Sequence, residues 1–360
     1  MKIAVLAIAK NEGKHVERWI NSALDADNII LVDTGSTDAT YEMALDHPRV
    51  TAHKISLAVW RFDIARNTAL SLVPADVDWV INLDLDEVLL PGWRQAMEKT
   101  IQENPGCNRL HYHYVWNWVS PGVPQTSFNR DMIHTRRGWL WKNPVHEVLK
   151  PLGQKDQIAF CPGLQVHHFA DDTKPRTQYL HLLKLSTLED KDSPRNFYYY
   201  ARELFNYNVL DEARAQFENY LALPGANFSA ERSEAYKYLS AINMKKGDVE
   251  DALKMARMAV VEAPNRREGW LQLARVCRET SRWHECFSAA MSCIGITDRS
   301  GTFLDSAEAW GSEPLHMLGV AEWKLGLVEN SLTHLTEALK LDPKNENLRR
   351  DFATVRSSRP

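Results

Sequence analysis

Two carboxylates one residue apart, Asp84 and Asp86, end an apolar run that begins at Trp79. A buried strand that ends in Asp-x-Asp places two hard oxygen ligands at the carboxyl edge of a sheet, the usual ligand crevice of an open α/β sheet. A divalent cation there can bridge the carboxylates to phosphate, so the pattern favours metal-assisted transfer from a nucleotide-linked donor. The pair alone is weak support, because acidic residues at strand ends also form helix caps or solvated turns.

The segments that must position this pair alternate between apolar runs and helical patterns. Apolar runs at residues 2–9 and 29–32 are each followed by a polar loop and a helical pattern. A third unit has a short strand near residues 49–55 and a helix that contains Arg66. Repeated strand-loop-helix units predict an α/β fold with a parallel sheet. The carboxylates and amides of the loops suit recognition of a base and a ribose.

Four short motifs, in this order, resemble the successive motifs of family 2 glycosyltransferases over roughly residues 1–105. They are Ala9-Lys10-Asn11-Glu12, the segment from Asp33 to Asp38, Phe62 with Ala65-Arg66-Asn67, and Asp84-Leu85-Asp86-Glu87. The resemblance implies a GT-A fold, a Rossmann-like nucleotide-sugar-binding domain, with a nucleoside-diphosphate sugar as donor and Mn²⁺ or Mg²⁺ as cofactor. It also implies direct displacement with inversion at the anomeric carbon, and it favours UDP as the nucleotide.

Carried over position by position, the resemblance implies a role for each matching residue. Asp33 would contact the nucleoside, and Arg66 would lie near the base or the diphosphate. Asp84 and Asp86 would form the metal motif, with Asp86 favoured as the direct ligand. The implied donor-binding residues are Ala9, Asn11, Glu12, Asp33, Arg66, Asp84 and Leu85.

Inverting transfer also needs a general base, because the acceptor must lose a proton as it attacks. Glu147 belongs to a His-Glu pair that recurs at this point in similar enzymes and is the predicted base, with Asp131 in reserve. Similar enzymes also place a metal-binding histidine after a short apolar strand, and His167 fits that position better than His168. Alternation along a strand points these two imidazoles to opposite faces, so only one can face the metal.

Residues 109–142 combine alternating aromatic side chains with arginines and are predicted to form the acceptor side of the cleft. The acceptor-side candidates are Trp116, Trp118, Arg136, Arg137 and Trp139. Aromatic faces stack on sugar rings and nucleobases alike, and arginines bind phosphate. The sequence therefore leaves open a protein or peptide side chain, a glycan or lipid-linked intermediate, and a hydroxymethylated DNA base of the kind phages glycosylate.

After about residue 173 the sequence contains helical patterns only, and small residues recur with a period of 34. The clearest copies start at Ser233 and Arg267, and Gly247 of the first is replaced by Ser281 in the second. This spacing resembles tetratricopeptide repeats (TPR). Stacked helix pairs present a concave surface that commonly binds peptides or mediates self-association, and they can also simply buttress a catalytic domain.

The composition fits two domains, which we expect at 1–172 (GT-A) and 173–360 (all-α, TPR-like). Residues 1–172 contain 17 basic and 21 acidic side chains, and the remainder contains 26 of each. This balance excludes an overall basic field of the kind that drives nonspecific DNA binding. No apolar run reaches the ~20 residues of a membrane-spanning helix. Five cysteines without metal spacing are explained by free thiols in the cytoplasm.

The predicted function is that of a metal-dependent inverting glycosyltransferase that moves a sugar from a UDP-linked donor to a hydroxyl acceptor on a protein or glycan. Two alternatives remain. One is a phage-type enzyme that acts on hydroxymethylated DNA bases, and the other is a non-catalytic repeat scaffold with a vestigial transferase fold. The intact Asp84 and Asp86 pair favours activity, because a vestigial site has no physical reason to keep like charges clustered.

Overall fold

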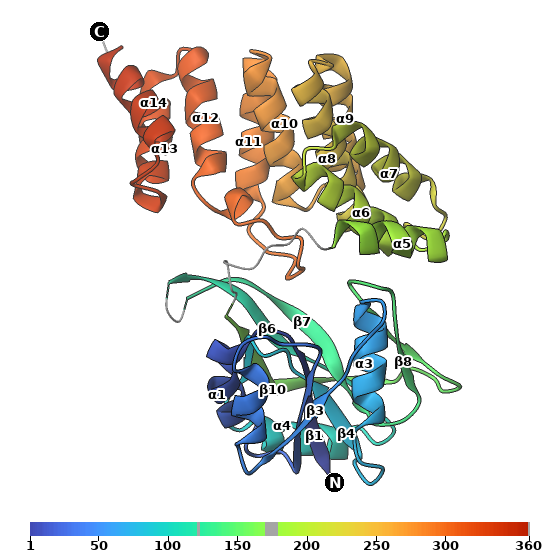
Figure 1. Ribbon diagram of the computed structural model, residues 1–360. Helices are drawn as coiled ribbons and strands as arrows, with labels where there is room; N and C mark the ends of the chain where they lie inside the picture. Colours follow the sequence, from blue (N-terminus) through green and yellow to red (C-terminus); the bar gives the residue numbers. More distant parts are fainter. Residues whose placement is uncertain (121–122, 170–178, 359–360) are drawn as a thin grey trace. The chain divides into compact units, whose positions relative to one another are not determined.

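The computed structural model describes residues 1–120, 123–169 and 179–358. These residues form two compact units, Met1–Ser186 and Thr187–Pro360 (Figure 1). The boundary expected between residues 172 and 173 lies outside the described residues. Helix α5 (Leu180–Glu189) contains the point at which the first unit ends and the second begins.

The first unit contains a mixed eight-stranded sheet in the order β3-β2-β1-β4-β7-β6-β10-β5. Four parallel strands form its first half: β3 (Val50–Lys54), β2 (Asn28–Asp33), β1 (Ile3–Ala9) and β4 (Trp79–Asn82). The sheet continues through β7 (Val123–Thr135), β6 (Arg109–Ser120), β10 (Ile158–His168) and β5 (Glu87–Leu89). Strand β7 is antiparallel to both β4 and β6. A separate hairpin consists of β8 (Trp139–Lys142) and β9 (Val148–Pro151).

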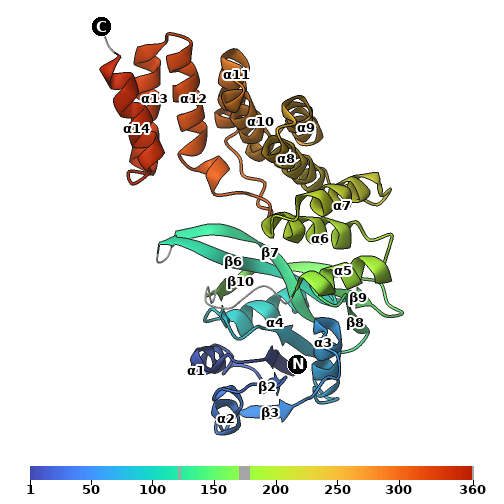
Figure 2. The same cartoon turned by 45° about the horizontal axis from the view of Figure 1, so that its top comes forward.

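Helices cover both faces of the parallel strands (Figure 2), because successive strand side chains point to opposite faces. Val5 and its odd-numbered neighbours in β1 share a core with α1 (Gly13–Ser22), α2 (Thr40–Leu45) and α4 (Trp93–Glu103). Leu6 and its even-numbered neighbours pack with α3 (Phe62–Ser71) in a second core. The expected strand-loop-helix units are confirmed, and β1 to β4 form the expected parallel arrangement within a sheet that is mixed as a whole.

The second unit is a stack of paired helices (Figure 1). The pairs are α6 (Pro194–Asn206) with α7 (Leu210–Ala222), α8 (Ser229–Lys246) with α9 (Val249–Glu262), α10 (Arg267–Glu279) with α11 (Trp283–Gly295), and α12 (Glu313–Lys324) with α13 (Val328–Leu341). A short 3₁₀ turn, Glu308–Trp310, precedes α12, and α14 (Glu346–Ser357) follows the last pair. The expected all-α helical-repeat domain is confirmed.

The turn between the two helices of each pair contains a residue in the left-handed conformation. Two pairs have glycine there, Gly247 and Gly326, both with φ of 83°, whereas Asn208 and Ser281 have φ of 59° and 57°. The 34-residue period aligns Ser281 with Gly247. The backbone therefore keeps the repeat geometry at a position where the sequence has lost its glycine.

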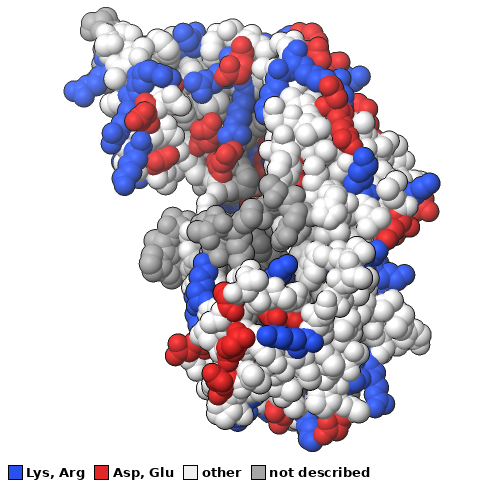
Figure 3. All heavy atoms as spheres, viewed as in Figure 1, with Lys and Arg blue, Asp and Glu red and all other residues white. Residues whose placement is uncertain are grey.

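Two further observations concern the surface of the described residues. Within those ranges, no helix is both long enough and apolar enough to cross a membrane. On the face shown in Figure 3, basic and acidic side chains are interspersed over both units and form no continuous basic surface.

Candidate active site

The loops that follow β1 and β2 meet at one edge of the sheet, because these strands are parallel. The Oδ1 atom of Asn11 accepts a hydrogen bond from the backbone N–H of Thr37 (2.7 Å), and the N–H of Asn11 donates to Ser36 Oγ (2.9 Å). Asp33, at the end of β2, is buried and accepts hydrogen bonds from the N–H groups of Gly35 and Ser36. The carboxylate predicted to contact the nucleoside is therefore fixed by its own loop.

Ala9 and Glu12, the other first-loop candidates, also contact the second loop. The Ala9 carbonyl accepts hydrogen bonds from the backbone N–H (2.9 Å) and the hydroxyl (3.0 Å) of Thr34. The N–H of Glu12 donates to Thr40 Oγ1 at 2.7 Å. These hydrogen bonds hold the loops after β1 and β2 together at the carboxyl edge of the sheet.

Asp84, Leu85 and Asp86 follow β4 at the same edge, and they divide between core and surface. Leu85 is buried in the core with α1 and α4, so a donor molecule can reach only its backbone. The side chains of Asp84 and Asp86 remain 32% and 26% exposed. Both carboxylates of the predicted metal motif can therefore be reached from solvent.

Arg66, in α3, joins Asp84 to Glu147, which is distant in the sequence. Its guanidinium donates to Asp84 Oδ1 at 3.0 Å and to Glu147 Oε1. Burial opposes the positive charge of Arg66, but Asp84 and Glu147 outweigh burial and raise the pKa of the guanidinium. Burial also raises the pKa of the Asp84 carboxyl, but Arg66 and Arg130 outweigh it and lower that pKa overall. The predicted general base thus lies in one ion-pair cluster with the predicted metal motif.

His168 faces Asp86, whereas His167, the histidine predicted from the sequence as the metal ligand, does not. His168 Nε2 lies 3.3 Å from Asp86 Oδ2, and Nδ1 lies 2.9 Å from the backbone carbonyl of Trp116. Because a carbonyl only accepts, Nδ1 carries a proton; the Nε2 atom that faces Asp86 donates to the carboxylate in the protonated ring and offers its lone pair to a metal ion in the neutral ring. His167 points to the other face of β10 and packs edge-on against Trp118 at 4.7 Å. Burial opposes the charged form of His168, but the contact with Asp86 raises the pKa of its imidazole.

The donor atoms of Asp86 and His168 fit a divalent metal ion. A metal-binding imidazole typically donates its other ring N–H to a carbonyl or carboxylate, as His168 does. Asp84 is less available, because it contacts Arg66 at 3.0 Å and Arg130 at 3.7 Å. Among the residues that the structure describes, no group of three or more His, Cys, Asp or Glu side chains is arranged to hold a metal by itself. A cation here would need further ligands from the diphosphate.

Glu87, Tyr114 and Arg130 support the Asp-x-Asp segment. The sequence placed Glu87 in the motif itself and Tyr114 and Arg130 in the predicted acceptor-side segment 109–142, but did not predict that they contact one another. The buried Glu87 carboxylate accepts hydrogen bonds from the Asp84 N–H (3.0 Å), the Tyr114 hydroxyl (2.8 Å) and the Arg130 guanidinium. Burial raises the pKa of Glu87; Arg130 opposes this shift, and Asp84 and Asp86 add to it. The position of Glu87 directly after Asp86 could have indicated its role from the sequence. Tyr114 and Arg130 reach Glu87 from β6 and β7, and the pairing of these strands could not be read from the sequence.

The structure places Trp116 and Trp118, two of the acceptor-side candidates, against the two histidines. Trp116 stacks on the His168 ring with centroids 4.3 Å apart and an interplanar angle of 13°. It remains 42% exposed, so one side of the indole is open to solvent beside Asp86. Trp118 donates from Nε1 to the His168 carbonyl at 3.4 Å.

Arg136, Arg137 and Trp139, the other acceptor-side candidates, lie at the opposite end of the sheet from the Asp-x-Asp segment. Strand β7 runs antiparallel to β4, so the residues after β7 approach the start of β4 and not its carboxyl end. Arg136 and Arg137 donate to backbone carbonyls of residues 73–75. Trp139 is buried in the core, with the Arg109 guanidinium over its ring.

Asp131, the reserve base, is also remote from the ion-pair cluster. It neighbours Arg130 in β7, and alternation along the strand points the two side chains to opposite faces. Asp131 pairs with Arg109 at 3.0 Å, whereas Arg130 contacts Glu87. Of the two predicted bases, the structure brings only Glu147 to Asp84 through Arg66.

Comparison with known proteins gives one family match and two relatives. Residues 4–158 match the model of glycosyl transferase family 2. A TPR repeat-containing protein of Synechococcus elongatus is 23% identical over 314 residues, which cover 81% of this chain and 75% of that protein. An uncharacterized glycosyltransferase of Rickettsia bellii is 34% identical over 89 residues, which cover 24% of this chain and 29% of the relative.

Solved structures of TPR proteins are similar to about half of the chain. The crystal structure of YrrB, described as a TPR protein with an unusual peptide-binding site, covers 49% of this chain and 82% of its own, with 14% identity and a TM-score of 0.39. A thermophilic TPR protein of Thermus thermophilus covers 49% of this chain and 89% of its own, with 19% identity and a TM-score of 0.35.

Proposed function

Because residues 4–158 belong to glycosyl transferase family 2 and TPR-like helix pairs follow, we propose that this protein is a metal-dependent inverting glycosyltransferase. It moves a sugar from a nucleoside-diphosphate donor to a hydroxyl group of a protein or glycan. The observation that carries the proposal is the cluster in which Arg66 joins Asp84 to Glu147. The cluster supports the proposal because it holds Glu147, the proposed base, close to Asp84 at the sheet edge.

In the proposed reaction, Glu147 accepts the proton of the acceptor hydroxyl as its oxygen attacks the anomeric carbon. A new carbon–oxygen bond forms while the bond to the diphosphate breaks, and the departing nucleoside diphosphate keeps the electron pair. Arg66 fixes Glu147 before the substrates bind. A bound diphosphate competes for the Arg66 guanidinium, so donor binding releases the Glu147 carboxylate for the proton transfer.

Asp86 and His168 are the residues that would hold Mn²⁺ or Mg²⁺ in this proposal. When bound, the cation offsets the negative charge that develops on the diphosphate, without any proton transfer. Asp84 has a different role, because it contacts Arg66 and Arg130. It keeps these two guanidinium groups beside the position of the diphosphate. The preference for a UDP-linked sugar rests on the family resemblance.

A protein or glycan acceptor is favoured over hydroxymethylated DNA. A DNA acceptor would need arginines directed at phosphates, and Arg136 and Arg137 are instead bound to backbone carbonyls. The exposed face of Trp116 suits the apolar face of a sugar ring or a peptide side chain. The helix pairs add a surface of a kind that commonly binds peptides.

A thermal-shift assay with Mn²⁺ and a panel of nucleotide sugars tests the proposal. We expect one UDP-sugar to stabilise the protein by about 2.7 kcal/mol at a hundredfold excess over its Kd. The same assay on Asp86→Ala is the matched control, and it should show a much smaller shift with Mn²⁺ present. No shift with any nucleotide sugar would favour the alternative of a repeat scaffold with a vestigial transferase fold.

A further inference from the structure

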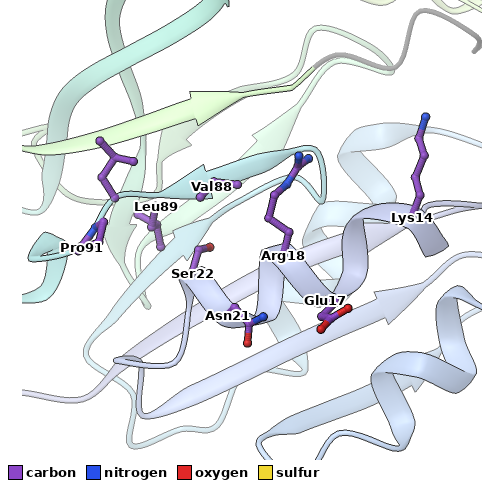
Figure 4. Close-up of a pocket in the computed structure, with 9 residues that line it drawn as sticks. Lys14, Glu17, Arg18, Asn21, Ser22, Val88, Leu89 and Pro91 are labelled. Carbon is purple, nitrogen blue, oxygen red and sulfur yellow. The ribbon is translucent and has the colours of Figure 1, made fainter. Parts of the chain in front are cut away.

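A hollow of about 510 Å³ lies between α1 and the β5 segment (Figure 4). Its lining residues are Lys14, Glu17, Arg18, Asn21, Ser22, Val88, Leu89, Leu90 and Pro91. The β5 wall begins two residues after Asp86 in the chain. None of the lining residues belongs to the donor-binding set predicted from the sequence.

The two walls of the hollow differ in chemistry. The wall from β5 and the residues after it is apolar, whereas the α1 wall is polar and carries two cations. Lys14 and Arg18 are one helical turn apart, and Figure 4 shows both side chains directed to the same side of α1. Glu17 points to a different side of the helix. The polar wall therefore offers two positive charges to one region.

Arg18 is held beside Asp86 without a carboxylate partner of its own among the described residues. Its guanidinium carbon lies 4.3 Å from the centre of the Phe169 ring, and the Phe169 N–H donates to the Asp86 carbonyl at 2.8 Å. One terminal nitrogen contacts His15 Nδ1 at 2.9 Å, and the buried Nε has no hydrogen-bond partner in the described part of the chain. Burial lowers the pKa of Arg18, against the opposing charge of Asp86. Among the described residues, this guanidinium therefore makes no direct ion pair with a carboxylate.

We propose that the hollow binds an anionic group, a phosphate or carboxylate, on the acceptor, with Arg18 and Lys14 as its cationic partners. The apolar wall at Val88 and Leu90 then contacts the uncharged body of the acceptor. The proposal rests on the proposed function, because it assumes that the nucleotide sugar binds at Asp86 and outside the hollow. It names an acid-bearing acceptor as the class of second substrate.

Amide chemical shifts of the full-length protein, titrated with glucose 6-phosphate, test this inference. We expect saturable shifts at residues 88–90, no such shifts with glucose, and weaker shifts with inorganic phosphate alone. Arg18→Gln should weaken glucose 6-phosphate binding by roughly tenfold or more, because a charge-assisted hydrogen bond is lost. Glu17→Gln, on the same helix, is the matched control and should bind at least as tightly as the wild type.

Three results would overturn the inference: equal binding by Arg18→Gln and the wild type, equal binding of glucose and its phosphate, or shifts confined to residues 84–86. Inorganic phosphate binding as tightly as glucose 6-phosphate would assign the hollow to a free anion and not to an acceptor. The nucleotide-sugar thermal shift of Arg18→Gln separates the two proposals. If that shift persists while the phosphate titration fails, only the acceptor inference is lost; absence of the shift in the wild type refutes the proposed function instead.

Discussion

At the scale of single residues, the two aspartates of the Asp-x-Asp pair have different partners. Asp84 contacts two guanidinium groups, those of Arg66 and Arg130, whereas Asp86 faces the imidazole of His168. A carboxylate already bound to two cations has less charge to offer a metal ion than one beside a neutral nitrogen ligand. We therefore infer that Asp86 binds the metal and that Asp84 orders the arginines.

His168→Ala should raise the Mn²⁺ concentration required for half-maximal activity by roughly tenfold or more, because a direct ligand matters at least as much as the outer residues that orient it. His167→Ala is the matched control, since His167 lies on the other face of β10 against Trp118. Manganese titrations of the initial transfer rate measure both variants. A larger effect in His167→Ala would restore the assignment made from the sequence.

Glu147→Gln should lower turnover by ~10²–10⁴-fold, the usual loss when a general base is removed. Affinity for the nucleotide sugar should be retained or increase, because the neutral amide competes less than the carboxylate with the diphosphate for Arg66. Steady-state rates with a separate donor-binding measurement distinguish the two effects. Asp131→Asn serves as the control; the assignment fails if this variant, and not Glu147→Gln, shows the loss.

At the scale of strands and helices, the sequence predicts which segments end at the active edge, but not which strands pair. Asp33 and Asp84 follow buried parallel strands, so their convergence could be predicted. Which of the two histidines faces Asp86 could not be predicted, because it depends on the pairing of β10 with β5, which puts His168 opposite Glu87. The position of Arg136 could not be predicted for the same reason, because it depends on the antiparallel pairing of β7 with β4.

The interior of the sheet provides a prediction about pH. His134 in β7 is buried and neutral, since its Nε2 contacts the Asn82 amide at 2.9 Å and its Nδ1 contacts the Thr135 carbonyl at 2.8 Å. Burial lowers the pKa of His134 to about 4. The unfolded chain, with an ordinary histidine pKa near 6.5, therefore binds more protons between about pH 6.5 and pH 4. The free energy of unfolding of the first unit should therefore decrease as the pH is lowered through this window, by about 2 kcal/mol between pH 8 and pH 5.

Urea unfolding of the wild type and of His134→Gln at several pH values checks this dependence. The variant should lose the contribution of His134 to the slope, whatever its stability at neutral pH. Parallel pH curves for the two proteins would show that His134 does not carry the effect.

The repeat turns give a second prediction at this scale. Ser281 occupies a left-handed position that glycine occupies in the equivalent turn at Gly247. Ser281→Gly should therefore stabilise the helical unit by about 0.5–1 kcal/mol, because glycine adopts positive φ without a steric cost. The reverse change, Gly247→Ser, should destabilise it by a similar amount, and nothing lies within 4 Å of the Cβ that it adds. Thermal unfolding of both variants measures the difference, and a stability loss in Ser281→Gly would contradict the argument.

At the scale of the whole molecule, two units with different chemistry share one chain. The first has the polar clusters of the candidate site at a sheet edge, and the second is built from close-packed small residues, such as the fully buried Ala256 and Ala290. The period of 34 was visible in the sequence because close helix packing tolerates only small side chains at fixed offsets. The acceptor was not visible, because aromatic and basic residues do not reveal their orientation until the sheet is assembled.

In the proposed function, five residues at the sheet edge together carry out sugar transfer from a nucleotide: Asp84, Asp86, Arg66, Glu147 and His168. The most direct measurement is the initial rate of nucleoside-diphosphate release from each of a panel of nucleotide sugars with Mn²⁺, in the wild type and in Asp86→Ala. We predict release from one UDP-sugar that stops in chelator and in Asp86→Ala, while circular dichroism shows that the variant stays folded. Undiminished release in Asp86→Ala, or in the wild type with chelator, would contradict the account.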